Sequence, residues 1–483
     1  MIPEAWRGGE VAVVGLGKSG VGAATLLARD GVRVYASDAG RGAALDGAAV
    51  TLRGLGVSVD VGDHDLDRIA RASLVVASPG VPPEAPPLAR AHEAGVAIVS
   101  EIEIGLRYLP PATRLIAVTG TNGKTTTTAM VGHLLRAMQL DAVDAGNIGT
   151  PLTTVALSPA PPAWIALEMS SFQLHDTPGL APTVGVVTNL SPDHLDRYAS
   201  VDDYYADKAL LFRNATAASR WVLNGDDAEV MRLGHRGIGT RPSGLGHPAP
   251  PSGPSADARR PSPDGRVLTF SLRAPADAWY DRARDVLVVL GGPLLARAEL
   301  ALFGDHNVAN ALAASLAVMA ADDAHATPQA RAAIASGLRS FRALAHRLES
   351  VGEVEGVLWI NDSKATNVSS TLVALEGMTR PTIVLLGGRH KGEPYTALAE
   401  PLRRIAKAVI AYGEAGPIVE RDLAGVVPLT RLGSDFGEVM ATAHALSKPG
   451  DVVLLSPACS SYDMFRNYEE RGATFRALAA GKA

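Results

Sequence analysis

The sequence has one cysteine, no block of like charge, and no long apolar run that is free of proline. Cys459 is the only cysteine among 483 residues, so an intrachain disulfide framework is impossible and a reducing compartment, the cytoplasm, is expected. The uncharged stretch 145–167 contains four prolines, which excludes a convincing membrane-spanning helix. Charged residues at Glu4, Arg7 and Glu10 come before the first apolar strand, so no signal peptide and no membrane insertion are expected.

The composition that remains is typical of a large α/β protein. Hydrophobic residues make up 47% of the chain and charged residues 20%, which is typical of a soluble fold with buried parallel strands. A length of 483 residues predicts about three domains. The net charge of −5 argues against nucleic acid as the main partner.

The most informative segment is the run T-G-T-N-G-K-T-T at 119–126. It follows an apolar strand at 115–118 and precedes a helical pattern at 127–138, as a phosphate-binding turn does. Backbone N–H groups and the helix N-terminus attract an anion, Lys124 adds a point charge, and Thr125 offers a hydroxyl to Mg²⁺. The second glycine follows the first by three residues, whereas the common pattern has five, so this is a narrower variant. The alternative is a glycine turn that only caps a helix.

A second glycine turn lies near the N-terminus. Apolar residues at 11–14 lead into G-L-G-K-S-G at 15–20, a helix at 21–29, and a strand at 32–36 that ends near Asp38. This βαβ pattern alone favours an NAD(P)-dependent oxidoreductase. That alternative leaves the 119–126 turn unexplained.

Strand patterns divide the chain into three parts. We predict domains at 1–109, 110–342 and 343–483, with a flexible Pro-, Gly- and Ser-rich insertion at about 235–265. Beyond those named, the expected strands are 74–77, 164–167, 184–188, 357–360, 382–386, 408–411 and 452–455. Polar residues follow many of these strands, where ligands bind in parallel sheets.

Three polar segments in the middle of the chain suggest a metal-assisted phosphate site. Glu168 follows a strand and, with Thr125, can offer the oxygen ligands that Mg²⁺ prefers. His194 and Lys208 are ambiguous on the residues alone. A hydrogen-bonded or surface histidine and a solvated helical lysine are the alternatives.

Several motifs in order resemble one family, the Mur ligases of peptidoglycan synthesis. Besides 119–126, the segments are E-M-S-S-F-Q-L (168–174), D-H-L-D-R-Y (193–198), H-N-V-A-N-A (306–311), A-H-R-L-E (345–349), N-D-S-K-A-T-N (361–367) and S-P-A-C-S-S-Y-D-M-F-R-N-Y-E-E-R-G (456–472). Folylpolyglutamate synthases share the turn and fold, but 168–174, 362–367 and 456–461 look like the Mur ligase branch that uses D-glutamate. The resemblance implies a Rossmann-like UDP-binding domain, a central P-loop-type ATPase domain and a Rossmann-like C-terminal domain. It also implies a monomer that ligates D-glutamate to UDP-N-acetylmuramoyl-L-alanine through an acyl phosphate, with ATP and two Mg²⁺ sites.

The resemblance also assigns residues to each substrate. The expected ATP contacts are Gly120, Thr121, Asn122, Gly123, Lys124, Thr125, Thr126, Asn307, Asn310, Arg347 and Asp362. The expected contacts to the UDP-sugar substrate are Gly17, Lys18, Ser19, Asp38, Ser78 and Asn147, and those to D-glutamate are Lys364, Thr366, Lys391, Ser461 and Tyr468. Thr125, Glu168, His194 and Lys208 are the expected metal ligands, with Lys208 as a carbamate, and Lys124, Glu168, His194 and Lys208 the expected catalytic residues. A non-catalytic nucleotide-binding scaffold is disfavoured because metal and acceptor residues are all present.

Overall fold

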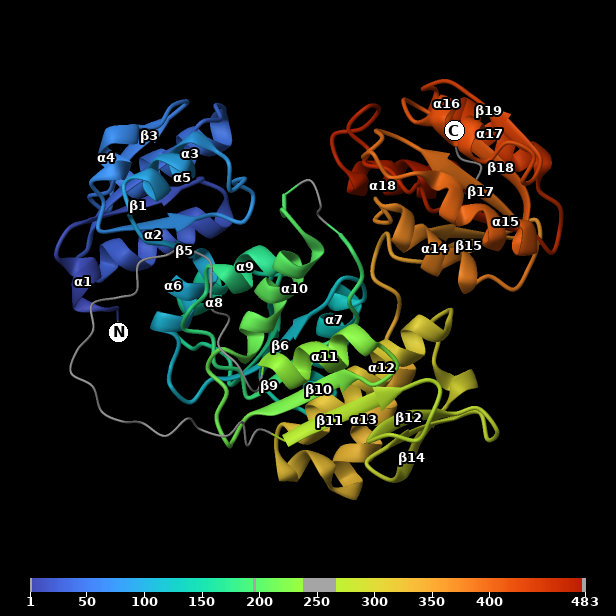
Figure 1. Cartoon of the computed structure of the whole chain (residues 1–483), viewed down its shortest axis with the longest axis horizontal. Coiled ribbons are helices and arrows are strands. Elements are labelled where there is room, and N and C mark those ends of the chain that lie inside the picture. Colours follow the sequence, from blue (N-terminus) through green and yellow to red (C-terminus); the bar gives the residue numbers. More distant parts are fainter. Residues whose placement is uncertain (1, 194–196, 238–265, 480–483) are drawn as a thin grey trace. The chain divides into compact units, whose positions relative to one another are not determined.

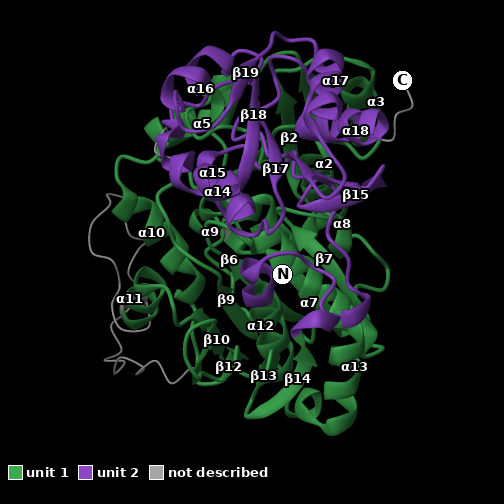
Figure 2. Ribbon diagram, turned by 90° about the vertical axis from the view of Figure 1, so that its right-hand side faces the viewer, with its two compact units in different colours: residues 1–296, 310–338 green, residues 297–309, 339–483 purple. Residues whose placement is uncertain are grey.

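The computed structural model describes residues 2–193, 197–237 and 266–479. The chain divides into two compact units, Met1–Ala296 with Asn310–Leu338 and Arg297–Ala309 with Arg339–Ala483 (Figure 2). We call them unit 1 and unit 2. Unit 1 contains two β-sheets and unit 2 contains one (Figure 1).

The first sheet of unit 1 is parallel throughout, in the order β3-β2-β1-β4-β5. Its strands are β1 (Glu10–Val14), β2 (Arg33–Asp38), β3 (Ser58–Val61), β4 (Leu74–Ala77) and β5 (Ile98–Ser100), and its helices are α1 (Glu4–Arg7), α2 (Lys18–Arg29), α3 (Ala43–Arg53), α4 (Leu66–Ala70), α5 (Pro86–Glu93) and α6 (Glu101–Tyr108). Val11 and Val13 belong to one apolar core, whereas Ala12 and Val14 belong to another. The central strand is therefore covered on both faces, as its continuous apolar run predicts.

The second sheet has nine strands, in the order β14-β13-β12-β11-β10-β9-β6-β8-β7. They are β6 (Arg114–Thr119), β7 (Ala142–Gly146), β8 (Trp164–Glu168), β9 (Val184–Val187), β10 (Arg220–Asn224), β11 (Arg266–Ser271), β12 (Ala278–Asp281), β13 (Val286–Val289) and β14 (Gly292–Ala296). The helices that belong to this part are α7 (Lys124–Ala137), α8 (Leu152–Ala156), α9 (Ser171–His175), α10 (Val201–Ala209), α11 (Ala228–Gly237), α12 (Asp305–Ala320, which begins in unit 2) and α13 (Pro328–Ser340). The pairings of β12 with β13 and of β13 with β14 are antiparallel.

Unit 2 is built on a six-stranded sheet, in the order β15-β16-β20-β17-β18-β19. Its strands are β15 (Glu349–Val354), β16 (Val357–Asn361), β17 (Thr382–Gly387), β18 (Ala406–Tyr412), β19 (Leu429–Arg431) and β20 (Val452–Leu455), and its helices are α14 (Val368–Glu376), α15 (Ala399–Ile405), α16 (Gly416–Asp422), α17 (Phe436–Leu446) and α18 (Tyr468–Ala479). Only β15 is antiparallel to its neighbour. The carboxyl ends of β16, β17 and β20 consequently meet at one edge of the sheet.

Both helices that follow the glycine turns begin earlier than the pattern predicts. Helix α2 begins at Lys18 and not at Val21, and α7 begins at Lys124 and not at Thr127. The helical backbone starts directly after a glycine N-cap, whereas apolar periodicity becomes visible only one turn later. Each turn therefore places its lysine at the first position of a helix.

The structure bears on two further expectations, about membrane helices and about the predicted insertion. Among the described residues, no helix is long and apolar enough to cross a membrane. Of the predicted insertion at 235–265, residues 235–237 lie in α11, and 238–265 lie outside the described residues.

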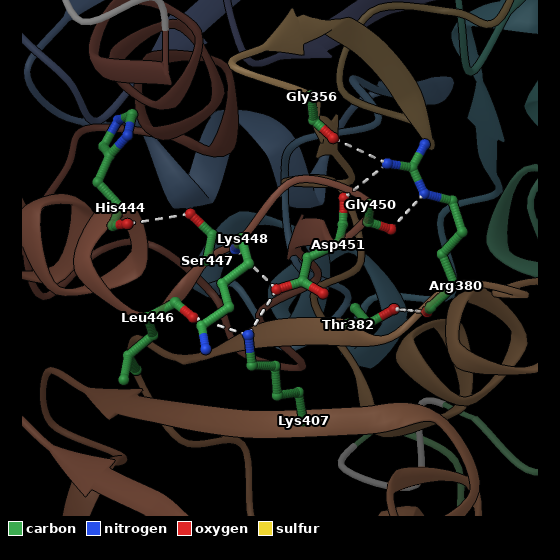
Figure 3. A network of polar contacts seen from close by, with 10 residues as sticks. All are labelled: Gly356, Arg380, Thr382, Lys407, His444, Leu446, Ser447, Lys448, Gly450 and Asp451. Atoms are coloured by element: carbon green, nitrogen blue, oxygen red, sulfur yellow. Dashed lines mark hydrogen bonds and ion pairs between the residues drawn. The ribbon is translucent and has the colours of Figure 1, made fainter.

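A polar network joins the amino ends of the strands in unit 2. The Arg380 guanidinium donates to the carbonyl oxygens of Gly450 (2.7 Å), Gly356 (3.1 Å) and Asp451 (3.1 Å), as Figure 3 shows. The Asp451 carboxylate accepts from Lys407 Nζ at 2.6 Å and from the Lys448 backbone N–H at 2.8 Å. This edge of the sheet is opposite to the one at which the polar motifs emerge.

Replacing Asp451 by alanine is expected to lower the free energy of unfolding of unit 2 by about 1–2 kcal/mol, because a partly buried lysine and a backbone N–H lose their acceptor. Activity per folded molecule should not change, since the carboxylate lies at the edge without motifs. Urea denaturation gives the first quantity, and initial rates give the second. An unchanged unfolding midpoint would contradict the stabilising role of this network.

Candidate functional site

At two positions of the turn between β6 and α7, the backbone has a conformation that residues other than glycine rarely adopt. Gly120 has a φ of +139° and Gly123 a φ of +82°. A Cβ at Gly120 would lie 2.0 Å from Thr188 Oγ1, and one at Gly123 would lie 2.6 Å from Asn310 Oδ1. Gly123, the N-cap residue of α7, has no side chain with which to cap the helix. The turn therefore combines tight backbone curvature with a helix N-terminus that can receive an anion.

The residues that follow β9 form hydrogen bonds to the backbone and side chains of this turn. The Asn122 backbone N–H donates to Asn189 Oδ1 at 2.8 Å, and Asn189 Nδ2 returns a bond to Asn122 O at 2.9 Å. Thr188 Oγ1 donates to the same carbonyl at 2.6 Å, and Thr121 Oγ1 donates to Ser191 O at 3.0 Å. The turn is thus preorganised by the chain itself, and a ligand does not have to order it.

Two lysines converge on one carbonyl oxygen of the turn. Lys124 Nζ donates to Gly120 O at 3.0 Å and to Thr121 O at 2.7 Å, and Lys208 Nζ from α10 donates to Gly120 O at 2.8 Å. Lys208 is only 1% exposed. Burial, followed by the charge of Lys124, holds the pKa of Lys208 well below its ordinary value. The alternative of a solvated helical lysine is therefore wrong.

Glu168 ends β8, beside β6, as a buried carboxylate that is 1% exposed. Asn147 Nδ2 donates to its Oε1 at 2.8 Å, and Asn147 N donates to its backbone oxygen at 3.0 Å. Its second oxygen, Oε2, is buried and has no hydrogen-bond partner among the described residues. An unpartnered buried carboxylate oxygen is costly, and a cation would supply the missing interaction.

A cavity of 390 Å³ in unit 1 brings together predicted residues from distant segments: Ser78, Lys124, Asn147 and Lys208. Polar groups that the sequence did not single out also line this cavity: Glu101, His175, Asp176, Arg197, Tyr198 and Asp207. Some of them belong to the quoted motif 193–198 or lie next to the 168–174 motif and Lys208, but no local pattern marks them as a group.

Three of these additional side chains form one hydrogen-bonded cluster. His175 Nδ1 lies 2.8 Å from Asp207 Oδ1, and Tyr198 donates to Asp207 Oδ2 at 2.9 Å. The bond to Asp207 raises the pKa of His175, and burial raises the pKa of the adjacent Asp176 to about 6. The cluster links α9, α10 and the segment between them on the wall of the cavity.

The glycine turn before α2 also has an open N-terminus. Gly17 and Lys18 are exposed, and Gly17 at the N-cap has no side chain that could cap the helix, so an anion can approach. A Cβ at Gly20 would lie 1.8 Å from Gly15 O, which explains the third glycine by close packing of helix and strand. The half-buried Ser19 is the second residue of this helix.

Asp38 and Ser78 hold this turn from its two sides. Asp38 Oδ2 accepts from the Leu16 N–H at 2.7 Å, and Oδ1 accepts from the Gly40 N–H at 2.8 Å. Ser78 Oγ donates to Gly15 O at 2.9 Å. The side chains of Asp38 and Ser78 both form hydrogen bonds to the backbone in this structure. They therefore also support the turn, a role that the sequence did not indicate.

The predicted adenine-side residues lie at the start of α12. Asn310, in unit 1, accepts from Thr127 Oγ1 at 3.1 Å beside the phosphate turn. Asn307, in unit 2, donates to Phe303 O at 2.8 Å.

Two of the expected metal ligands remain to be placed. Thr125 is 6% exposed, and its neighbour Thr126 is half-buried at the start of α7. His194 lies outside the described residues.

Most of the predicted residues of unit 2 lie after β16, β17 and β20 and at the start of α18, whereas Arg347 precedes β15. Asp362 accepts from Ser456 Oγ at 2.8 Å and from the Leu348 N–H at 3.2 Å, and burial raises its pKa to about 7. Lys364 Nζ lies 5.2 Å from the centre of the Tyr468 ring. The others are the half-buried Arg347 and Thr366, the buried Ser461 and the exposed Lys391. Within the described residues, no group of three or more His, Cys, Asp or Glu side chains is placed to hold a metal ion.

Comparisons with known proteins match each part of the chain to one family. The matching descriptions are "Mur ligase MurD-like, N-terminal domain" over residues 9–100, "Mur ligase middle domain" over 118–239, and "Mur ligase, glutamate ligase domain" over 346–459.

Curated relatives match along nearly their whole length. A protein named UDP-N-acetylmuramoylalanine--D-glutamate ligase from Anaeromyxobacter dehalogenans is 41% identical over 99% of this chain and 98% of its own. Proteins of the same name from Chromobacterium violaceum and Salinibacter ruber are 40% and 38% identical, again over at least 98% of both chains.

Solved structures share the three-domain α/β fold. The UDP-N-acetylmuramate-alanine ligase MurC of Thermotoga maritima is 19% identical with a TM-score of 0.58, covering 98% of this chain and all of its own. A pseudomurein peptide ligase type C from Methanothermus fervidus is 18% identical with a TM-score of 0.56, covering 98% of both chains. At such identities the likeness shows the fold, and it confirms the predicted fold class.

Proposed function

This chain belongs to the Mur ligase family, and we propose that it joins D-glutamate to UDP-N-acetylmuramoyl-L-alanine in the cytoplasmic synthesis of peptidoglycan precursors. Mur ligases are ATP-dependent enzymes that form amide bonds. The names of the full-length relatives support D-glutamate as the amino acid that is added. We expect the enzyme to act as a monomer and without nucleic acid.

The proposed reaction has two steps. A carboxylate is a poor acyl donor, so the L-alanyl carboxylate first attacks the γ-phosphorus of ATP, forming an acyl phosphate as the bond to ADP breaks. The D-glutamate amine then attacks the acyl carbon, phosphate leaves with the bonding electrons, and the amine loses a proton as the amide forms. Both steps gather negative charge in one place, so catalysis depends on positioned cationic and N–H groups.

The observation that best supports this chemistry is the convergence of Lys124 and Lys208 on Gly120 O, beside the open N-terminus of α7. Two amines this close repel each other when both are charged, which favours an uncharged Lys208 beside a charged Lys124 and leaves Lys124 to face the phosphates. We assign Lys124 to the transferred phosphoryl group. We assign the cavity that runs from Ser78 to Asn147 to the UDP-sugar substrate.

The residues present fit a Mg²⁺ ion. Glu168 offers a buried oxygen that has no partner among the described residues, and Thr125, the second residue of α7, offers a hydroxyl. Mg²⁺ bound there would neutralise charge on phosphate and carboxylate oxygens. We also propose a second Mg²⁺ site, at His194 and Lys208.

We propose further that Lys208 carries a carbamate. Its neutral amine would attack CO₂, forming an N–C bond and releasing one proton, and the product is an anion with two oxygen donors. The burial of Lys208 supports this proposal, because burial favours an uncharged amine over an ammonium. A cation would then compensate the buried carbamate charge.

In unit 2 we assign the nucleotide to Arg347 and Asp362, and D-glutamate to Thr366, Lys391, Ser461 and Tyr468, with Lys364 adding positive charge. The assigned D-glutamate groups offer hydroxyls and one exposed ammonium. Such groups suit an amino acid with two carboxylates.

A direct assay tests the function. The protein is incubated with ATP, Mg²⁺ and UDP-N-acetylmuramoyl-L-alanine, and phosphate release is measured with D-glutamate and, separately, with L-glutamate, D-aspartate and glycine. Release is expected to need both co-substrates and to be fastest with D-glutamate. Equal phosphate release without an amino acid would indicate an ATPase or a scaffold. Faster release with another amino acid would replace D-glutamate as the proposed substrate. NAD(P)H-dependent absorbance changes would favour the oxidoreductase alternative.

A further inference from the structure

Arg471, in the first turn of α18, is completely buried, with 0% of its surface exposed. Its guanidinium donates from Nε to Ser363 Oγ at 2.9 Å and from Nη2 to Ser363 O at 2.8 Å. The same Nη2 donates to Cys459 O at 3.1 Å. Nη1 makes longer bonds, to Ser460 O at 3.4 Å and to Gly387 O at 3.5 Å. One planar side chain therefore joins three separate loops.

These three loops carry the residues that we assign to D-glutamate. The loop after β16 contains Ser363 and leads to Thr366, the loop after β17 leads from Gly387 to Lys391, and the loop after β20 contains Ser460 and Ser461. The fourth assigned residue is also connected, because Ser363 Oγ donates to Tyr468 O at 2.8 Å.

The loops approach too closely for an ordinary side chain between them. Arg389 N donates to Ser460 O at 2.8 Å, which pairs the second loop with the third. Gly388 has a φ of +127°, and a Cβ there would lie 2.2 Å from Ser460 O and 3.1 Å from Arg471 Nη1. Gly388 is thus required by the approach of the two loops around the guanidinium, whereas Gly387 is required by the backbone of Tyr412 at the end of β18.

Stability alone does not account for a buried guanidinium of this kind. Among the described residues, no carboxylate forms an ion pair with Arg471, and all five of its bonds go to neutral oxygens. The charge of Arg471 also acts on the buried Asp362, but without a direct ion pair. Burying a cation without a directly bonded anion is costly, and an apolar side chain of similar size usually stabilises a core at least as well. A rigid fork of donors does something that an apolar group cannot, because it fixes the spacing of the oxygens it binds.

We propose that Arg471 is a positioning residue for the amino-acid acceptor site, holding the loops that carry Thr366, Lys391 and Ser461 at the spacing that D-glutamate needs. This inference rests on the proposed function. Arg471 itself touches only protein groups, so it acts through the loops and not on the reacting atoms.

The test is the variant Arg471→Lys, which keeps the positive charge but loses the planar fork. The KM for D-glutamate is expected to rise about 10–100-fold, as when other supporting groups behind a site are removed. The KM values for ATP and for UDP-N-acetylmuramoyl-L-alanine should change much less. Ser363→Ala, a smaller change, should raise the KM for D-glutamate in the same direction, because it removes one acceptor of Arg471 and the link to Tyr468.

Asp451→Ala is the matched control, since it destabilises the same unit from the opposite edge of the sheet (Figure 3). If the folded Arg471→Lys variant keeps a normal KM for D-glutamate, or if the control raises that KM equally, Arg471 is only a structural residue. If Arg471→Lys does not fold, a normal KM in Ser363→Ala overturns the inference. A wild-type chain that releases no phosphate with D-glutamate would overturn the proposed function itself, and this inference with it.

Discussion

Lys124→Ala is expected to lower the rate of ligation by about 10³-fold while the chain remains folded. The ammonium group sits at the first position of α7, where it would meet the phosphoryl group that leaves ATP, and loss of one such charged donor commonly removes a factor of about 10²–10³. The cost to stability should be about 1 kcal/mol, because the bonds that disappear run from Lys124 to two carbonyls of its own turn. Phosphate release and thermal unfolding, measured on the same sample, separate the two effects.

Two further variants sharpen this test. Lys124→Arg keeps the positive charge but not the compact ammonium, so it should recover only part of the rate. Lys448→Ala removes an exposed lysine at the amino ends of the strands in unit 2, opposite to the edge with the polar motifs, and should leave the rate unchanged. Near-normal turnover in Lys124→Ala would contradict the assignment of the 119–126 turn to the phosphates.

Lys208→Ala is expected to be nearly inactive, with a loss on the order of 100-fold or more, and small carboxylic acids such as acetate should restore part of the rate. The expected reason is that the variant loses the oxygen donors of the carbamate, and acetate offers similar donors in the vacated space. ATP affinity, measured by titration, should change less than turnover, because the turn around Lys124 is retained. ¹³C NMR with labelled bicarbonate should detect the carbamate in the wild-type chain and not in the variant.

Lys208→Met separates this role from packing, since methionine fills the buried space without a nitrogen. If Lys208 only packs against the Tyr204 ring of its own helix, Lys208→Met stays active and acetate has no effect on either variant. An ammonium at Lys208 in a crystal structure of the substrate-bound enzyme would refute the carbamate and leave the ligase proposal standing.

The fold was predictable where the signal is local. Glycine turns between an apolar strand and a helix depend on neighbouring residues only, so the residue order alone is enough to place the segments around Gly17 and Gly123. The antiparallel strands β12, β13 and β14 escaped prediction, because short apolar runs such as 286–289 are equally compatible with several structures. The start of α7 at Lys124 was also not predicted, because the polar residues of its first turn do not show the spacing of apolar residues that indicates a helix.

The sequence by itself determined the family, the two glycine turns and the identity of Lys124, because these are matters of residue order and local backbone geometry. Only the tertiary structure decided that Lys208 is buried beside Lys124 and that Arg471 joins three loops. It also decided that Asn147 binds one oxygen of Glu168, while the other has no partner within the described part of the chain. Burial and pairing depend on residues that are tens to more than a hundred positions apart, and a pattern along one chain does not encode which of its lysines or arginines loses contact with water.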